Sequence, residues 1–202
     1  MKPFGICMGG NEEFIKLAVM GVIQEKMNNI RYVEIGIGEG KTFSAVCELI
    51  NSLVDSWKGT AIDLTFGWSF VLDAYNSNVA EFGDKTELLL MGSPKALDSF
   101  AENSIDIAFI DGDHSEKHVL ADFKAVDRCL TKGGLVIFHD TDEASQGLDV
   151  GFGVQIFGIQ VRDALKKLGV LSDTLPNYSL ILDYDGDRSL GGRGIVMIKK
   201  VG

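Results

Sequence analysis

Residues 33–42 read VEIGIGEGKT, and this stretch decides the predicted fold. A β-branched apolar run leads into Gly36, Gly38 and Gly40, and apolar residues at helical spacing follow over residues 41–55. Glycine tolerates positive φ values and lets the backbone come close to a ligand. The first turn of the following helix presents N–H groups that have no partner within the helix. The stretch therefore predicts a strand, a ligand-binding turn and a helix.

Strands and helices alternate along the rest of the chain. Strands are expected over residues 31–37, 59–64, 86–91, 104–111, 135–139, 178–183 and 194–200. Helices are expected over residues 41–55, 69–82, 94–100, 115–130 and 154–168. An opening helix, capped by Asn11, is expected to stop near Asn28, and Lys132-Gly133-Gly134 is expected to end the helix over residues 115–130. This order predicts an α/β protein with a doubly wound, mostly parallel sheet, helices on both faces and an antiparallel pair at the end.

Composition narrows the class of protein. A length of 202 residues predicts one domain, and a net charge of −10 without a basic stripe argues against nucleic-acid binding. The sequence shows no signal-peptide pattern and no run of about 20 apolar residues, so no membrane partner is expected. Cys7, Cys47 and Cys129 form no metal or disulfide motif, which predicts a reduced, cytoplasmic protein. Cys47 and Cys129 lie on apolar helical faces and are expected to pack in the interior.

Three kinds of ligand compete for the glycine-rich turn. The dinucleotide pattern GxGxxG fits poorly, because the turn reads GxGxG. The phosphate-binding pattern GxxxxGK(S/T) needs a glycine where this chain has Ile35. An acidic residue followed by GxGxG, here Glu34 and the glycines, is typical of S-adenosylmethionine (SAM) sites. Glu34 suits the ammonium and sulfonium groups of SAM and would repel a pyrophosphate. A glycine-rich turn without a ligand is the remaining alternative.

Two strand ends extend the expected SAM site. Asp63 ends the second predicted strand, where a carboxylate can accept both ribose hydroxyls of a nucleoside. Gly92 and Ser93 follow the third strand, where the adenine is expected, with a plain loop as the alternative. The expected SAM contacts are Glu34, Gly36, Ile37, Gly38, Gly40, Thr42, Asp63, Leu64, Gly92, Ser93 and Asp111.

A second polar cluster follows the fourth and fifth predicted strands. Asp111 ends the fourth strand, and His139 and Asp140 end the fifth, so neighbouring strands would place them across one cleft. Two close carboxylates repel unless a proton or cation lies between them, and carboxylate ligands suit Mg²⁺, Ca²⁺ or Mn²⁺. The predicted metal ligands are Asp111, His139 and Asp140. In the alternative, Asp140 caps the next segment and Asp111 shapes a turn.

Asp113 and His114 are candidate general bases for a methyl transfer from SAM. A hydroxyl that attacks a sulfonium methyl group must lose its proton, and a nearby His or Asp can accept it. An N-capping or supporting role is the alternative for His114. His118, one helical turn further on, is expected to be a solvated helix residue.

Residues 109–142, FIDGDHSEKHVLADFKAVDRCLTKGGLVIFHDTD, resemble the signature block of a group of class I SAM-dependent methyltransferases. The group comprises the macrocin, mycinamicin and novobiocin sugar O-methyltransferases and the cephalosporin hydroxylase family. With the glycine-rich turn and Asp63, the resemblance covers about residues 31–142. It implies a Rossmann-like, seven-stranded sheet whose last strand is antiparallel, with SAM held at Glu34, Gly36 and Asp63. Some relatives form oligomers, so a homo-oligomer is a further expectation.

The resemblance also implies roles for the second cluster. In metal-dependent members, Mg²⁺ binds at the position of Asp111 and at an acidic pair after the fifth strand. Here that pair is His139-Asp140, so a histidine replaces one acidic ligand. The bases proposed for the family fall at the positions of Asp113 or His114, and this sequence has both.

The sequence as a whole predicts one SAM-dependent methyltransferase domain, in which a helical segment (1–30) precedes a cofactor and catalytic core (31–142) and a lid loop, helix and terminal β pair (143–202). The expected reaction is methylation of an oxygen of a small hydroxylated molecule. A catalytically inactive SAM-binding module and a P-loop nucleotide-binding protein are the alternatives. Trp68 and Phe70 are expected either to line the acceptor pocket or to be core aromatics.

Overall fold

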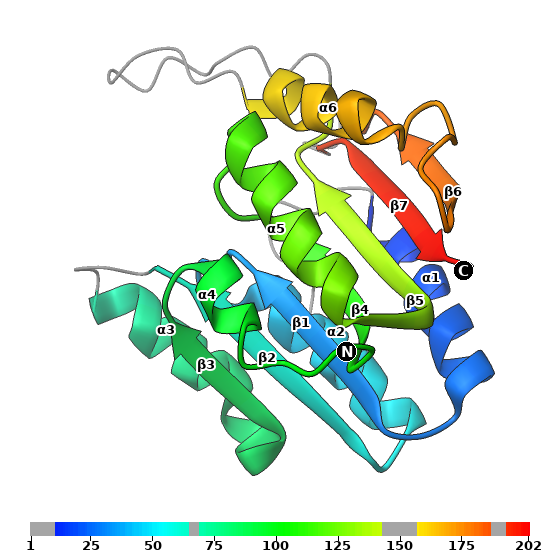
Figure 1. Cartoon of the computed structure of the whole chain (residues 1–202). Coiled ribbons are helices and arrows are strands. Elements are labelled where there is room, and N and C mark those ends of the chain that lie inside the picture. The colour runs from blue at the N-terminus through cyan, green and yellow to red at the C-terminus, as the bar shows by residue number, and fades with distance from the viewer. Residues whose placement is uncertain (1–10, 65–68, 143–156, 187–192) are drawn as a thin grey trace.

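The protein is seen in a computed structural model that describes residues 11–64, 69–142, 157–186 and 193–202. A seven-stranded sheet runs through the molecule, with helices packed on both of its faces (Figure 1). The strands are β1 (Ile30–Ile35), β2 (Trp57–Asp63), β3 (Thr86–Leu90), β4 (Ile105–Ile110), β5 (Leu130–His139), β6 (Tyr178–Tyr184) and β7 (Ile195–Lys200). The helices are α1 (Glu12–Lys26), α2 (Lys41–Leu53), α3 (Ser69–Val79), the 3-10 helix η2 (Ala80–Lys85), α4 (Ser93–Leu97), α5 (Glu116–Cys129) and α6 (Phe157–Leu168).

The strand order β3-β2-β1-β4-β5-β7-β6 confirms the doubly wound sheet predicted from the sequence. Strands β1 to β5 pair in parallel, and β7 is antiparallel to both of its neighbours, β5 and β6. The chain moves outward from β1 to β3 and then returns to place β4 on the other side of β1. Ligands of such sheets bind at the carboxyl ends of the strands near this change of direction. The topology therefore brings the glycine-rich turn after β1 beside the residues that follow β4.

Each face of the sheet is covered by its own apolar layer. Side chains of α1, α2 and α3 pack on one face around residues such as Tyr32 and Phe43. Side chains of α4, α5 and α6 pack on the other face around residues such as Phe123 and Phe138. Every residue of β4 is buried, which is what a central strand covered by helices on both faces requires.

The boundary between α5 and β5 differs from the sequence-based expectation. The helix ends at Cys129 and the strand begins at once with Leu130, whereas the predicted helix ran through Leu130 to a glycine stop and the predicted strand began at Leu135. Leu130 is fully buried and pairs with Ile105 of β4, and the pairing resumes at Leu135 after a register shift. Gly133 has φ +77° in this irregular part of the strand. Gly133 and Gly134 therefore lie in a β-bulge and do not end the helix. The strand begins five residues earlier than predicted, because Leu130 is buried and pairs with β4.

Two helix predictions need smaller corrections. Asn11 precedes α1 but makes no side-chain capping bond; its side-chain amide instead donates to the backbone oxygen of Arg193, before β7. The helix predicted over residues 69–82 is divided into α3 and η2, and Gly83 inside η2 has non-helical dihedral angles. In the first case a long-range partner replaces the local cap, which sequence spacing does not reveal.

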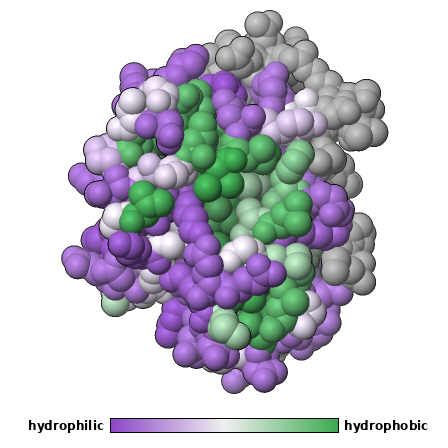
Figure 2. Space-filling view, turned by 90° about the vertical axis from the view of Figure 1, so that its right-hand side faces the viewer, coloured by the Kyte–Doolittle hydropathy of each residue, from purple (hydrophilic) through white to green (hydrophobic). Residues whose placement is uncertain are grey.

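Several composition-based expectations can be compared with the described residues. Cys47 and Cys129 are free and buried, as predicted, whereas Cys7 lies outside the described residues. None of the described helices combines the length and the apolar character that crossing a bilayer requires. Figure 2 shows apolar surface on the side of the molecule that carries α1. Met27, directly after α1, is 70% exposed. Met27 and Leu53 of α2 line a hollow of about 290 Å³. The expected homo-oligomer stays a prediction.

Candidate active site

The turn between β1 and α2 depends on its glycines. Gly36, Gly38 and Gly40 have φ values of +81°, +47° and +72°. A Cβ atom on Gly36 would lie 2.1 Å from the backbone oxygen of Asp111, so only glycine lets this turn pack against the end of β4. A Cβ atom on Gly40 would lie 2.6 Å from the ring of Tyr75 on α3. The predicted strand–turn–helix unit is therefore present, and the turn is wedged between β4 and α3.

Asp63, at the end of β2, holds the same turn from the other side. Its Oδ2 atom accepts hydrogen bonds from the backbone N–H groups of Ile37, at 2.8 Å, and Gly38, at 3.3 Å. The sequence predicted only contacts between Asp63 and a ribose. The structure adds that this carboxylate fixes the backbone of the turn. Hydrogen bonds therefore connect the glycine-rich turn after β1 to the end of β2, the two parts of the predicted SAM site.

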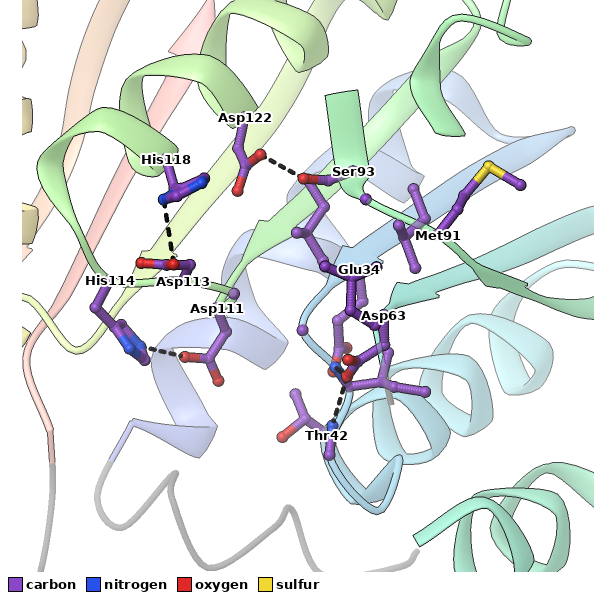
Figure 3. A pocket seen from close by; sticks show the side chains of 18 of the residues that line it. Glu34, Thr42, Asp63, Met91, Ser93, Asp111, Asp113, His114, His118 and Asp122 are labelled. Carbon is purple, nitrogen blue, oxygen red and sulfur yellow. Dashed lines mark hydrogen bonds and ion pairs between the residues drawn. The ribbon is translucent and has the colours of Figure 1, made fainter. Parts of the chain in front are cut away.

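A cavity of about 860 Å³ opens over the carboxyl ends of β1, β2, β3 and β4 (Figure 3). Its wall contains every predicted SAM contact except Gly40, which lies behind the turn against Tyr75. The wall also contains Met91, His118 and Asp122, which the sequence analysis did not assign to the SAM site. Asp122 had a recognisable signal, because it is a carboxylate on the buried face of α5 that also carries Val119, Phe123 and Val126.

Glu34 forms a buried acidic floor for the cavity. The side chain is 2% exposed, and the hydroxyl of Tyr32 donates a hydrogen bond to it. Burial raises the pKa of Glu34 well above its usual range, and the nearby carboxylates of Asp111 and Asp63 raise it further, against the hydrogen bond from Tyr32. A cation bound above Glu34 would relieve this penalty, so the site favours a positively charged ligand.

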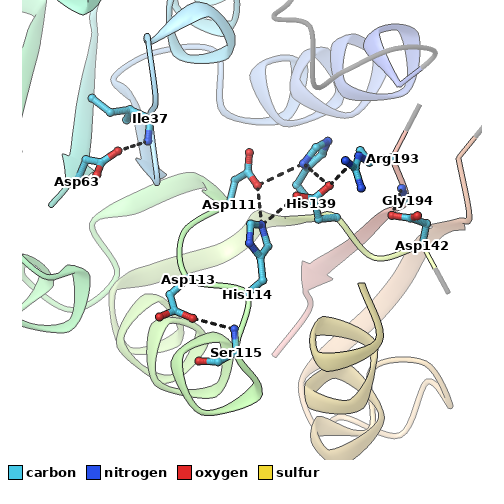
Figure 4. A network of polar contacts seen from close by, with 11 residues as sticks. Ile37, Asp63, Asp111, Asp113, His114, Ser115, His139, Asp142, Arg193 and Gly194 are labelled. Carbon is cyan, nitrogen blue, oxygen red and sulfur yellow. Dashed lines mark hydrogen bonds and ion pairs between the residues drawn. The ribbon is translucent and has the colours of Figure 1, made fainter. Parts of the chain in front are cut away.

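A network of carboxylates and imidazoles lies at the ends of β4 and β5 (Figure 4). His114 Nε2 lies 3.3 Å from Asp111 Oδ1 and 3.0 Å from Asp140 Oδ2. His139 Nδ1 lies 3.2 Å from the same oxygen of Asp111, and its ring, 1% exposed, packs 5.9 Å from the ring of Phe109. The pairing of β4 with β5 brings these residues together, as predicted from the sequence.

The family is decided by residues 33–141, which match a family described as a methyltransferase domain. This chain belongs to that methyltransferase family. The matched residues contain both the glycine-rich turn and the acidic network, and the match confirms the family assignment made from the sequence.

One curated protein resembles this chain in sequence, and solved structures share its fold. An uncharacterized protein, y4gI, of Sinorhizobium fredii is 28% identical over 175 residues, which include 71% of this chain and 19% of the relative. A protein of Corynebacterium glutamicum shares the fold with a TM-score of 0.67 and 17% identity, covering 95% of this chain and 82% of that one. An O-methyltransferase of Bacillus cereus, in complex with S-adenosylhomocysteine (SAH), has a TM-score of 0.63 and 17% identity, covering 92% of this chain and 79% of that one. The chain thus spans about a fifth of the curated relative and most of each solved structure.

The charge state of His114 follows from its two carboxylate neighbours. Burial lowers the pKa of His114, but hydrogen bonds and charge interactions with Asp111 and Asp140 outweigh it and raise the pKa to about 9. Burial also opposes the charged form of Asp111, but His139 and His114 lower its pKa to about 2. His114 is therefore a cation that joins two carboxylates at neutral pH. A protonated imidazole cannot accept a proton. His114 can therefore act as the predicted base only when another cation pairs with Asp111 and Asp140 and the pKa of His114 falls.

Asp113 is fixed by the start of α5. Its Oδ1 atom accepts a hydrogen bond of 2.8 Å from the backbone N–H of Ser115, and its Oδ2 atom lies 3.1 Å from Nδ1 of His118. Both side chains are more than half exposed, and both line the cavity. Asp113 thus remains a candidate base that faces solvent, and His118, although solvated as predicted, also belongs to the cavity wall.

Side chains at the ends of β4 and β5 fit a divalent cation. Asp111, His139 and Asp140 each offer a ligand atom, and these atoms lie within 4.8 Å of one another. Asp140 Oδ1 is buried and accepts no hydrogen bond from the described residues, and the backbone of Asp140 is held at φ +52°. Two carboxylates and an imidazole nitrogen suit Mn²⁺, Fe²⁺ or Zn²⁺ better than Mg²⁺, which prefers oxygen ligands.

Some predicted features lie elsewhere or outside the described residues. Phe70 is 59% exposed on α3, so it is neither a core aromatic nor part of the described cavity wall. Trp68 and the loop expected to act as a lid, residues 143–153, lie outside the described residues.

Proposed function

We propose that this methyltransferase transfers the methyl group of SAM to an oxygen atom of a small hydroxylated molecule. The observation that carries the proposal is the buried Glu34 beneath the glycine-rich turn, at the floor of a cavity large enough for a nucleoside and a second reactant. SAM meets the requirements of this site, because it carries an ammonium and a sulfonium but no phosphate.

The residues at the strand ends divide the cavity into regions of different chemistry. Glu34 and the turn after β1 face the amino-acid part of SAM, and Asp63 offers its carboxylate to the ribose. The methyl group then points toward the network formed by Asp111, His114 and Asp140, where the acceptor binds. The two reactants are held in line, and much of the rate acceleration of a methyl transfer comes from such positioning.

The methyl transfer is a single displacement. The acceptor oxygen forms a bond to the methyl carbon while the bond between that carbon and the sulfonium sulfur breaks, which leaves SAH. The acceptor hydroxyl loses its proton to a base, for which Asp113 and His114 are the candidates. A divalent cation held by Asp111, His139 and Asp140 would lower the pKa of the acceptor hydroxyl when bound.

The cavity wall also limits the class of acceptor. Glu34, Asp63, Asp111, Asp113 and Asp140 all contribute carboxyl groups to it. A phosphorylated acceptor would be repelled by this wall unless a metal ion intervened. We therefore expect an uncharged or cationic hydroxylated acceptor.

Titration of the protein with SAH and with ATP, each with and without Mn²⁺, tests the proposal. SAH is expected to bind in the absence of a metal and ATP is expected not to bind. Incubation with SAM and a panel of hydroxylated sugars and phenols, with SAH release as the readout, then tests turnover. Binding of ATP in preference to SAH would overturn the proposal, and binding of SAH without turnover on any acceptor would favour a SAM-binding module.

A further inference from the structure

Asp122 is a buried carboxylate that the proposed methyl transfer does not use. It lies on α5, is 3% exposed, and borders the cavity beside Ser93 and Met91 (Figure 3). The hydroxyl of Ser93 donates a hydrogen bond to Oδ1 of Asp122. Its Oδ2 atom receives no hydrogen bond from the described residues and lies 3.7 Å from the position of a Cβ atom built on Gly112. Asp122 is thus a largely buried carboxylate at the wall of the cavity, with Oδ2 free of protein donors in the described part of the chain, and a donor from a ligand can pair with it.

The surroundings of Asp122 match a planar, partly apolar ligand. Asp63 of β2 pairs in register with Leu90 of β3, so the cavity continues from the ribose-binding carboxylate toward Met91. Leu64 and Met91 are large apolar side chains that stay exposed, at 52% and 36%, where they line this part of the cavity. Apolar walls with a single carboxylate at the edge suit an aromatic ring that carries an N–H donor on its rim.

We propose that Asp122 determines the base specificity of the site by accepting a hydrogen bond from the exocyclic amino group of adenine. The inference rests on the proposed function, because SAM brings the adenine into the cavity. Hypoxanthine carries a carbonyl oxygen where adenine carries this amino group, so its oxygen would face the carboxylate and be rejected. A site built around one hydrogen bond discriminates strongly against analogues that cannot make it.

The ionisation of Asp122 is consistent with such a role. Burial raises the pKa of Asp122 to about 6, against the hydrogen bond from Ser93 and the charge of His118, while Asp113 raises it further. At pH 8 the side chain is therefore a carboxylate, able to accept but not to donate a hydrogen bond.

The test measures two ligands on two proteins by calorimetry at pH 8. Wild-type protein is expected to bind SAH at least about tenfold more tightly than S-inosylhomocysteine, its deaminated analogue. Asp122→Asn keeps an oxygen for the Ser93 hydroxyl but can donate to a carbonyl, so this preference is expected to fall to about twofold or to reverse. Glu116→Gln, a carboxylate-to-amide change on the same helix outside the cavity wall, is the matched control and is expected to keep the wild-type preference.

The outcomes separate this inference from the proposed function. Equal binding of SAH and S-inosylhomocysteine to wild-type protein, or an unchanged preference in Asp122→Asn, would overturn the role of Asp122 and leave the proposed function standing. Absence of SAH binding to wild-type protein would overturn both. If Asp122→Asn fails to fold, the wild-type protein with the analogue that has hydrogen in place of the amino group decides, because equal affinity for that analogue and SAH contradicts the inference.

Discussion

His114 lies between Asp111 and Asp140, with its Nε2 atom 3.3 Å from Oδ1 of Asp111 and 3.0 Å from Oδ2 of Asp140. The same two carboxylates belong to the candidate metal site, together with His139. The protonated imidazole of His114 and a divalent cation therefore compete for the same negative charge.

Removal of His114 is expected to strengthen metal binding. In His114→Ala the two carboxylates lose the cation that contacts both of them, while His139 and Arg193 stay close. Mn²⁺ should therefore bind at least about tenfold more tightly than in wild-type protein, as measured by calorimetry or by the electron paramagnetic resonance of free Mn²⁺. His118→Ala is the control, because His118 pairs with Asp113 and makes no contact with Asp111 or Asp140 in the described part of the chain. Weaker Mn²⁺ binding in His114→Ala would contradict the competition.

Removal of the charge of Glu34 is expected to weaken cofactor binding without weakening the fold. Glu34→Gln keeps an acceptor for the Tyr32 hydroxyl and removes a buried carboxylate, so thermal stability should stay equal or rise. The affinity for SAH, whose ammonium group needs a counter-charge, should fall by about tenfold or more. Glu39→Gln, a half-exposed carboxylate at the edge of the same cavity, should cause a smaller loss because solvent screens it. Equal losses in the two variants would argue against the role of Glu34.

Two glycines of the turn are expected to differ sharply in their tolerance of alanine. Gly36→Ala adds a Cβ atom 2.1 Å from the backbone oxygen of Asp111 at φ +81°, so β1 and β4 must move apart. The free energy of unfolding should fall by more than about 3 kcal/mol. Gly38→Ala meets nothing within 4 Å and carries only the cost of φ +47°, which amounts to about 1–2 kcal/mol. Chemical denaturation measures both changes, and similar losses would contradict the packing of the turn on β4.

The stability of the protein is expected to depend on the ionisation of Asp122. The folded-state pKa of about 6 lies above the ordinary aspartate value of 3.8, so the folded protein binds this proton more tightly than the unfolded chain. The resulting stabilisation is complete below pH 3.8 and is lost as the pH rises to about 6. Asp122→Asn lacks this loss, so its stability relative to wild-type protein should rise by at most about 3 kcal/mol between pH 4 and pH 6 and then level off.

Denaturation of both proteins at several pH values checks this dependence on Asp122. His118 and Asp113, which face Asp122, are present in both proteins and cancel in the comparison. A stability difference that does not change with pH would show that Asp122 has the same pKa in the folded and unfolded chain.

Local patterns predicted most of the fold. The alternation of apolar strands with helical periodicity was sufficient for the order of elements, because parallel β–α units leave a strong period in the sequence. The boundary at Leu130 was predicted wrongly, because Gly133 and Gly134 are typical of a helix stop and the pairing of Leu130 with Ile105 is a long-range contact. The side-chain contact of Asn11 with Arg193 escaped prediction for the same reason.

The candidate site was predicted in its residues but not in its contacts. The acidic residue and glycines of the turn, Asp63 and the cluster after β4 and β5 are all visible as motifs, because each stands at a strand end. Asp122 interrupts the apolar face of α5, but its contact with Ser93 could not be predicted, because it depends on the packing of α5 on α4.

The sequence by itself determined the order of strands and helices, the glycine-rich turn with its acidic partner, and the family. These features depend on residues that are close in the sequence, so their spacing can be read directly from it. Only the tertiary structure decided that Asp63 holds the turn, that His114 joins Asp111 to Asp140, and that Asp122 faces the cavity. The physical reason is that burial and the charge of spatial neighbours, which set the pKa and the role of each side chain, arise only when distant strands and helices pack together.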